Sequence, residues 1–206
     1  MLLAINAKNP QPRLISQVVE ILRRGGVIAY PTDTYYGIGC DIMNKKAIGR
    51  IYRLKQRNQK KPFSFICSDL TNISRYAKVS NYTYKTMKRL LPGPYTFVLE
   101  GSTLVPKIML THRKTAGIRV PDHPICLALV KELGNPVIST TAPLADSPAD
   151  GGSDPYLIHE ALGSQIDLVI DGGPVQGGPS SVVSLIGDIP EVIREGLGDV
   201  STFQAV

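Results

Sequence analysis

The feature that most constrains the fold is an alternation of amphipathic segments with short apolar runs along most of the chain. In residues 11–24, Leu14, Val18 and Leu22 recur every four residues, which is typical of one helix face, and a Gly-Gly pair follows. Residues 27–30 then form a short apolar run that a proline ends, as expected of a buried strand. Because helix and strand patterns keep alternating in this way, the sequence predicts an α/β fold.

The remaining elements follow from the same two periodicities. Helices are predicted over residues 44–55, 81–91, 124–133 and 155–162, and strands over residues 63–67, 95–100, 117–120, 137–141, 168–170, 181–186 and 192–194. The glycines of Gly37-Ile38-Gly39 predict a turn. The last strands are spaced like a hairpin, so we expect a mixed sheet rather than a wholly parallel one. No repeat or long linker divides the 206 residues, which suit a single domain.

Composition excludes several classes of protein. No apolar run reaches the ~18 residues that a membrane span needs, and polar residues follow the first methionine too soon for a signal peptide. The three cysteines are an odd number without CxxC spacing, which predicts reduced thiols and a cytoplasmic location. The three histidines are scattered, so no metal site is expected. The sequence therefore argues against secreted, membrane and zinc-scaffold proteins.

The formal net charge of +6 conceals an uneven distribution. Residues 42–99 contain 13 lysines and arginines and one acid, whereas residues 121–206 contain two such cations and 12 acids. A fold that gathers the cations on one face would bind the phosphates of a nucleotide or of a nucleic acid. The alternative is a solvated basic helix that pairs with acids of the second half.

Familiar nucleotide and nucleophile motifs are absent from the sequence. It contains no GxxxxGK[ST], no GxGxxG and no GxSxG, and no histidine has an evident nucleophile as a partner. An enzyme with this sequence is therefore expected to act by positioning and charge stabilisation, as in nucleotidyl transfer.

Two polar loops in the first third of the chain are candidates for ligand binding. Residues 30–39 offer threonine and tyrosine hydroxyls to a small polar ligand, or else form a turn whose hydroxyls satisfy the local backbone. Lys55 and Arg57 follow a predicted helix, where two cations could hold a polyphosphate or simply be solvated.

The second half of the chain offers two more such loops and one unusual cation. Residues 139–143 follow a strand, and the glycine-rich residues 171–181 would let backbone amides approach an anion, although both could be plain turns. Arg119 falls within a strand pattern, where a cation needs an acidic partner or an anionic ligand.

Taken in this order, these segments resemble the YrdC-like family, which includes threonylcarbamoyl-AMP synthases. The resemblance covers about residues 11–199. It is carried by residues 26–37, 55–57, 117–121, 138–142, 179–183 and 193–196. Residues 61–70 are most similar to the YciO branch of the family. The resemblance implies one domain over residues 1–206, without the additional C-terminal domain of longer relatives, in which a twisted α/β fold encloses a basic concave cavity.

The activity implied by the resemblance joins L-threonine, bicarbonate and ATP into threonylcarbamoyl-AMP and pyrophosphate. This product supplies the threonylcarbamoyl group that is placed on adenosine in certain tRNAs. ATP would bring Mg²⁺ as part of the substrate, and no tightly bound cofactor is expected. The alternative is a YciO-type paralogue that binds double-stranded RNA, tRNA or nucleotide through the cations of residues 42–99 without this catalysis.

The resemblance also implies roles for individual residues. L-Threonine would be held by Thr32, Arg119, Ser139 and Ser180. ATP would face Lys55, Arg57, Thr115, Thr141 and Arg194, with Lys55 and Arg57 as the catalytic pair. The sequence departs from the family pattern at the nucleotide end. Its Ser-x-Asn is Thr141-Ala142-Pro143, the serine expected eight positions later is Ala149, and the histidine that several synthases carry near Ile66 is absent.

Overall fold

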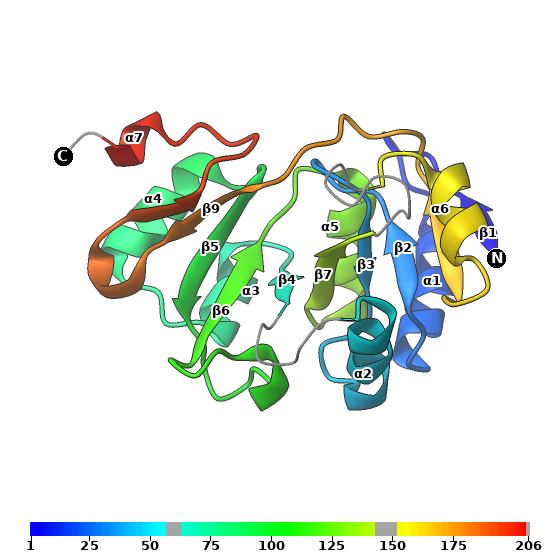
Figure 1. Cartoon of the computed structure of the whole chain (residues 1–206), viewed down its shortest axis with the longest axis horizontal. Helices are drawn as coiled ribbons and strands as arrows, with labels where there is room; N and C mark the ends of the chain where they lie inside the picture. Colours follow the sequence, from blue (N-terminus) through cyan, green and yellow to red (C-terminus); the bar gives the residue numbers. More distant parts are fainter. Residues whose placement is uncertain (57–62, 143–151, 205–206) are drawn as a thin grey trace.

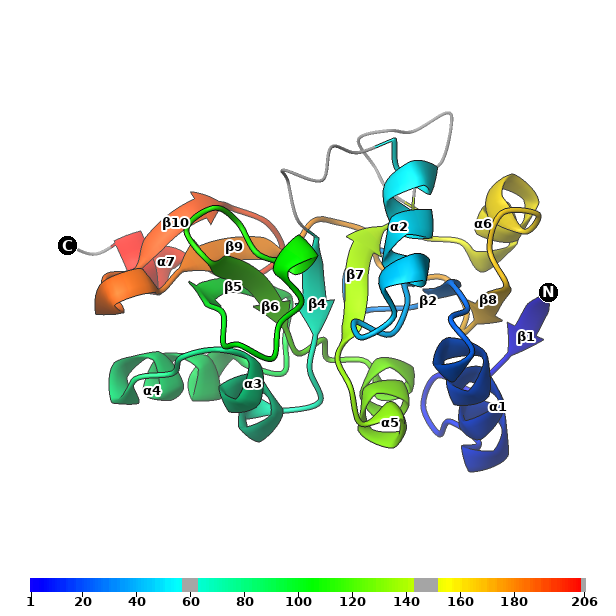
Figure 2. The same cartoon turned by 90° about the horizontal axis from the view of Figure 1, so that it is seen from below.

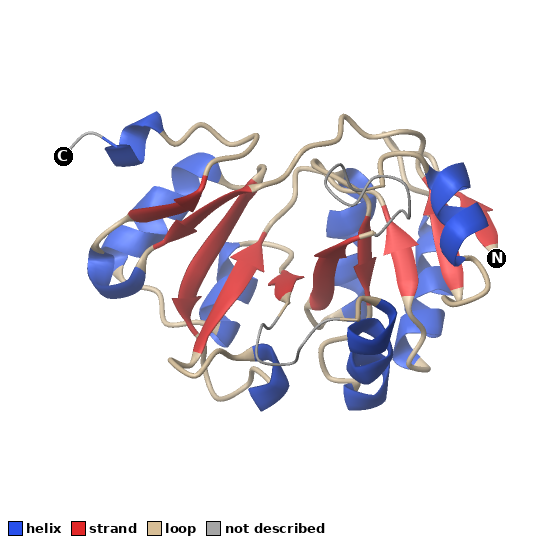
Figure 3. Cartoon of the chain, in the orientation of Figure 1, coloured by secondary structure: helices blue, strands red, loops and turns tan. Residues whose placement is uncertain are grey.

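The computed structural model describes residues 1–56, 63–142 and 152–204, and in them one twisted sheet of ten strands is flanked by helices (Figure 1, Figure 3). The strands are β1 (Leu2–Ala4), β2 (Ile28–Tyr30), β3 (Gly37–Gly39), β4 (Ser64–Ile66), β5 (Tyr95–Glu100), β6 (Thr115–Arg119), β7 (Val137–Thr141), β8 (Leu168–Asp171), β9 (Ser181–Ser184) and β10 (Glu191–Arg194). The sheet is mixed, as predicted, because pairs such as β1–β8 and β5–β9 are parallel whereas β2–β3 and β9–β10 are antiparallel. Across the sheet the order is β1-β8-β2-β3-β7-β4-β6-β5-β9-β10.

The helices begin and end where local sequence provides a cap or a stop. They are α1 (Pro12–Arg23), α2 (Lys45–Leu54), α3 (Leu70–Tyr76), α4 (Asn81–Leu90), α5 (Pro124–Leu133), α6 (Pro155–Leu162) and α7 (Ser201–Gln204), with 3-10 turns η1 (Lys107–Met109) and η2 (Ile186–Asp188). The Asn44 side chain accepts the Ala47 N–H at 3.0 Å and so caps α2. Gly134, with φ of 80°, ends α5 in the left-handed conformation. No helix among the described residues is long and apolar enough to cross a membrane.

Strands β1, β8, β2 and β3 form a half of the sheet that helices cover on both faces (Figure 2). Ile28 and Tyr30 of β2 are buried in one cluster with apolar residues of α1 and α5. Ala29 and Val169 point the other way, into the cluster that contains apolar residues of α2 and α6. Both faces of β2 and β8 are therefore core.

Beyond β7, strands β4, β6, β5, β9 and β10 form the other half, and among the described helices α3 and α4 cover one of its faces (Figure 2). Phe65 of β4 contacts Tyr76 of α3 edge to face, with ring centroids 6.2 Å apart, and Phe97 of β5 lies in the same core. The opposite face of this half carries serine, threonine and arginine side chains.

The expected turn at Gly37-Ile38-Gly39 is wrong, because these residues form β3 between β2 and β7. The two glycines are needed because the ring of Tyr30 lies against β3. A Cβ at Gly39 would stand 2.8 Å from the Tyr30 ring and 2.1 Å from the Ile138 carbonyl oxygen. Glycine at these positions therefore serves close packing rather than a reversal of the chain. The strand expected over 181–186 ends at Ser184, and η2 follows.

Candidate functional site

A cavity of about 500 Å³ lies on the open face of the second half of the sheet. Its described lining includes nine serine and threonine residues and two arginines, but no carboxylate. The serines and threonines are Thr34, Ser64, Thr96, Thr111, Thr115, Ser139, Thr140, Thr141 and Ser180. Such a surface offers many neutral donors and acceptors around two fixed positive charges, which suits a polar anionic ligand.

The cavity floor follows from the alternation of side chains along the strands. Thr115, Gly117 and Arg119 of β6 line the cavity, whereas Ile118 is buried in the core below, and the small Ala116 is buried but still borders the cavity. Thr96 of β5 likewise faces the cavity while Phe97 is core. A period of two between hydroxyl and apolar residues thus marks strands with one open face.

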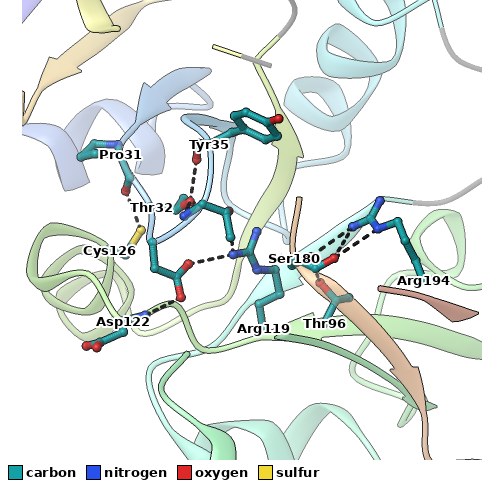
Figure 4. A network of polar contacts seen from close by, with 11 residues as sticks. Pro31, Thr32, Tyr35, Thr96, Arg119, Asp122, Cys126, Ser180 and Arg194 are labelled. Atoms are coloured by element: carbon teal, nitrogen blue, oxygen red, sulfur yellow. Dashed lines mark hydrogen bonds and ion pairs between the residues drawn. The ribbon is translucent and has the colours of Figure 1, made fainter. Parts of the chain in front are cut away.

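Arg119 is a buried cation whose guanidinium group is hydrogen-bonded through one nitrogen, Nη2. It is 7% exposed, and its Nη2 donates to Asp33 Oδ1 at 2.8 Å and to Thr34 Oγ1 at 2.9 Å (Figure 4). The second oxygen of Asp33 accepts the Asp122 N–H at 3.0 Å. Arg119 Nε is buried and has no hydrogen-bond partner among the residues that the structure describes. The sequence expectation of an acidic partner or an anionic ligand is met by Asp33, and the guanidinium still has an unused donor.

Arg194 lies on the other side of Ser180 from Arg119 (Figure 4). Its Nε and Nη2 donate to the Ser180 carbonyl oxygen at 3.1 and 2.8 Å, and the Ser180 hydroxyl shares a hydrogen bond of 2.8 Å with Thr96 Oγ1. Burial, and then the positive charge of Arg119, lower the pKa of Arg194. Since the two guanidinium groups repel each other, an anion bound between them would relieve that repulsion.

The cysteine behind the site is not placed to act as a nucleophile. Cys126 Sγ donates to the Pro31 carbonyl oxygen at 3.0 Å (Figure 4). Complete burial, reinforced by the charge of Asp33, raises the pKa of this thiol. Because the thiolate is the reactive form, a thiol held protonated in this way is inert. Cys40 and Cys67 are also free and buried.

The model of one family, Sua5/YciO/YrdC, described as "Telomere recombination", matches residues 20–196. The chain belongs to this family. YciO of Escherichia coli (strain K12), named as an uncharacterized protein, is 46% identical over 200 residues that cover 97% of each chain. The threonylcarbamoyl-AMP synthase of Bacillus subtilis (strain 168) is 33% identical over 196 residues, which cover 93% of this chain and 55% of that protein. The resemblance stated from the sequence is thus confirmed.

Solved structures agree with this membership. The crystal structure of E. coli YciO superposes with a TM-score of 0.93 at 45% identity and covers 98% of both chains. The crystal structure of P. abyssi Sua5 complexed with L-threonine superposes with a TM-score of 0.87 at 26% identity, covering 95% of this chain and 57% of that one. The Sua5/YciO/YrdC fold expected from the sequence is therefore confirmed.

Most of the residues singled out from the sequence come together in the cavity. Its lining includes Arg119, Ser139, Ser180, Thr115, Thr141 and Arg194. Lys55 lies at the end of α2, and its Nζ donates to the Thr141 carbonyl oxygen at 3.0 Å. Arg57, Pro143 and Ala149 lie outside the described residues. The ligand roles expected of all these side chains stay predictions.

Thr32 is placed differently from the rest of this set. It is 2% exposed, and its hydroxyl shares a hydrogen bond of 2.9 Å with Thr34 Oγ1 and donates to the Tyr35 carbonyl oxygen. Thr34, two residues later, lines the cavity and contacts Arg119. Sequence reasoning offered the polar side chains of this loop to a ligand but gave an individual role to Thr32 and not to Thr34 or Asp33, and it did not name Thr96. An alternation count along 95–100 could have identified Thr96, because it falls on the polar face of that strand.

The described residues contain no group of three or more histidine, cysteine, aspartate or glutamate side chains that could hold a metal ion. The Mg²⁺ that ATP would bring therefore stays an expectation about the substrate, not about a site built into these residues.

Proposed function

We propose that the protein synthesises L-threonylcarbamoyl-AMP from L-threonine, bicarbonate and ATP, with the cavity as the active site. The observation that carries the proposal is the buried Arg119, which Asp33 holds at one corner and whose Nε has no partner among the described residues. A carboxylate is the ligand that such a guanidinium edge binds best. The 33% identity to the B. subtilis synthase and the likeness to a Sua5 bound to L-threonine support the choice of substrate.

In this proposal the carboxylate of L-threonine binds Arg119, and its polar groups reach the hydroxyls of Thr34, Ser139 and Ser180. All four residues line the cavity. Arg194 lies on the opposite side of Ser180, where a phosphate group of ATP would offset its charge. The positive charges of the buried Arg119 and of Arg194 at the cavity edge would stabilise negative charge that develops during transfer.

Thr115, Thr141, Lys55 and Arg57 complete the proposed nucleotide side. The first two line the cavity, and Lys55 reaches the Thr141 carbonyl. Lys55 and Arg57 would contact phosphates as ATP binds, which assigns them the catalytic role expected from the sequence. The nucleotide would carry its own Mg²⁺, which would share the charge of the phosphates with these cations.

The chemistry needs little covalent help from the protein. The neutral amine of threonine attacks bicarbonate to give a carbamate and water. A carbamate oxygen then attacks the α-phosphorus of ATP, forming one P–O bond while the bond to the bridging oxygen breaks and its electron pair leaves with pyrophosphate. The protein would hold the two substrates in line and stabilise the charge on the phosphates. This agrees with a described lining that has hydroxyls and arginines but no carboxylate.

The proposal is tested by threonine-dependent release of pyrophosphate from Mg-ATP in bicarbonate buffer, with detection of threonylcarbamoyl-AMP. Arg119→Gln removes the charge at the threonine site, so we expect kcat/KM for L-threonine to fall roughly a hundredfold, as for loss of a charge-assisted hydrogen bond of about 3 kcal/mol. Arg113→Gln is the matched control, because Arg113 is exposed and lies outside the cavity lining. Equal activity of the two variants, or no product from folded wild-type protein, would contradict the proposal.

A second candidate is a YciO-type paralogue that binds RNA without this catalysis, and a group of exposed cations outside the cavity lining favours it. Lys45, Lys46 and Arg53 are exposed on α2, which Tyr52 joins to η1 through a hydrogen bond of 3.3 Å from its hydroxyl to the Ile108 carbonyl oxygen. Lys107, near that contact, is exposed too. Under this candidate the same preparation would release no pyrophosphate but would bind double-stranded RNA with an affinity that falls steeply with salt.

A further inference from the structure

Arg194 reaches the cavity through an irregularity in the last hairpin. Strand β10 pairs with β9 through Glu191 opposite Ser184 and Val192 opposite Val183, but the next pair is Arg194 opposite Val182. Two residues of β10, Ile193 and Arg194, thus face a single residue of β9. This is a β-bulge, a device that bends a strand and changes the direction of a side chain.

The change of register continues beyond the strand. The Leu197 N–H donates to the Pro179 carbonyl oxygen at 2.9 Å, which is the register of the Arg194–Val182 pair and not that of Val192 and Val183. Gly196 fits tightly in this register, because a Cβ there would stand 2.3 Å from the Pro179 carbonyl oxygen. Residues 194–197 are therefore displaced by one position along the neighbouring strand.

The displacement decides which face of the sheet carries the arginine. Ser180 and Val182 line the cavity, whereas Ser181 and Val183 are fully buried on the opposite face. In an unbroken ladder Arg194 would stand opposite Ser181 and point away from the cavity, because directly opposite residues share a face. With the bulge it stands opposite Val182 and donates to the Ser180 carbonyl oxygen.

The side chain of Ile193 does not explain why β10 contains an extra residue at this position. It is an isoleucine that is 56% exposed, so little apolar surface is buried at this position. The bulge therefore reflects the extra residue in β10 and not the side chain at position 193.

We propose that the bulge accommodates Ile193 as an extra residue of β10, so that Arg194 stands opposite Val182 and faces the cavity. The direction of Arg194 then follows from this register and not from the side chain of Ile193. The inference rests on the proposed function only in taking the phosphates of ATP as the ligand of Arg194.

An exchange variant, I193R/R194I, tests the proposal without changing composition or charge. It moves the arginine to the exposed bulge position, so affinity for inorganic pyrophosphate should fall about ten- to a hundredfold, as for Arg194→Ala, and KM for ATP should rise. Ile193→Ala keeps the bulge, so its affinity should stay within about twofold of wild type. Deletion of Ile193 closes the ladder with Arg194 still opposite Val182, and we expect it to retain binding as well.

The proposal is overturned if the exchange variant binds pyrophosphate like wild type, or if deletion of Ile193 alone abolishes binding in a folded protein. Crystal structures of the two variants give a readout that does not depend on catalysis. The transplanted arginine should face solvent in the exchange variant, and Arg194 should remain in the cavity after the deletion. If wild-type protein binds no pyrophosphate, the proposed function fails, and the side of the sheet seen in these structures still decides the role of the bulge.

Discussion

The two halves of the sheet bury the faces of their strands differently. In β2 and β8 the residues on both faces are apolar, as Ile28 and Ala29 are, and helices cover both sides. In β5 and β6 apolar residues such as Phe97 alternate with cavity residues such as Thr96, and α3 and α4 cover one side. The difference teaches that a binding surface can be read from strand periodicity, because only a strand with one open face alternates. It also separates residues that serve stability from those that serve the ligand.

The largest expected effect contrasts one residue from each half. Ile28→Ala leaves a void between β2 and the helices, because Ile28 is fully buried, and should lower the free energy of unfolding by about 2–5 kcal/mol. Thr96→Val keeps the volume and removes the hydrogen bond to Ser180, so the loss should be only about 0.5–1.5 kcal/mol. Urea unfolding of both variants measures the difference. Similar losses would mean that the cavity floor is as much a part of the core as β2 is.

A second variant, Gly117→Val, adds volume in the cavity and leaves the half of the sheet that is covered on both faces unchanged. A Cβ at Gly117 would lie 3.1 Å from Thr96 Cγ2 and 3.2 Å from Ser64 Cβ, so the larger side chain of Gly117→Val has to extend into the cavity. We expect L-threonine to bind about tenfold more weakly, equivalent to ~1.4 kcal/mol, in a calorimetric titration. Gly49→Ala on α2 is the control, since a Cβ there meets nothing within 4 Å. Unchanged threonine affinity in Gly117→Val would place the ligand elsewhere.

The smallest expected effect concerns His123, which precedes α5 close to Asp33 and Asp122. Burial lowers the pKa of His123, although these two carboxylates act in the opposite direction, and its Nδ1 is buried without a hydrogen-bond partner in the described part of the chain. The unfolded chain therefore binds a proton below about pH 6.5 that the folded protein resists, so stability falls as pH decreases through that range.

The variant His123→Asn places a favourable N-cap residue before α5, where His123 makes no side-chain capping bond, and it removes this titration. Unfolding free energies are measured for both proteins from about pH 7 to pH 5.5. The wild type should lose stability relative to the variant as pH falls, because only the wild type loses the contribution of His123. Parallel curves would show that His123 is not held neutral by its burial.

Much of the fold could be predicted because its elements have local causes. Helix α5 has a proline at its start and Gly134 at its end, and its predicted bounds are the observed ones. The short helix α3 was missed because only Ile73 and Tyr76 of its seven residues are buried, too few to establish a helical period. Strand β3 was taken for a turn because the cause of its glycines is the ring of Tyr30, a contact that local sequence does not reveal.

Site residues could be predicted where a residue type was unusual for its element. They could not be predicted where two residues far apart in the sequence form a pair. Arg119 was identified because a cation within a strand needs a partner. That the partner is Asp33, 86 residues earlier, depends on the register of the sheet. A strict period of two along β10 would place Arg194 on the face away from the cavity. The bulge that reverses this assignment is not visible in the sequence.

The pairing of β1 with β8 has a consequence for how the chain is made. Leu2 lies opposite Val169, and Ile28 of β2 lies opposite Leu168 of the same strand. During synthesis β1, and the edge of β2 that does not pair with β3, must wait for a strand that the ribosome adds more than a hundred residues later, which at 5–20 residues per second takes roughly 8–30 s. Completion of the doubly covered half is therefore a late, non-local event in translation, and until β8 emerges the nascent chain carries an unpaired strand edge.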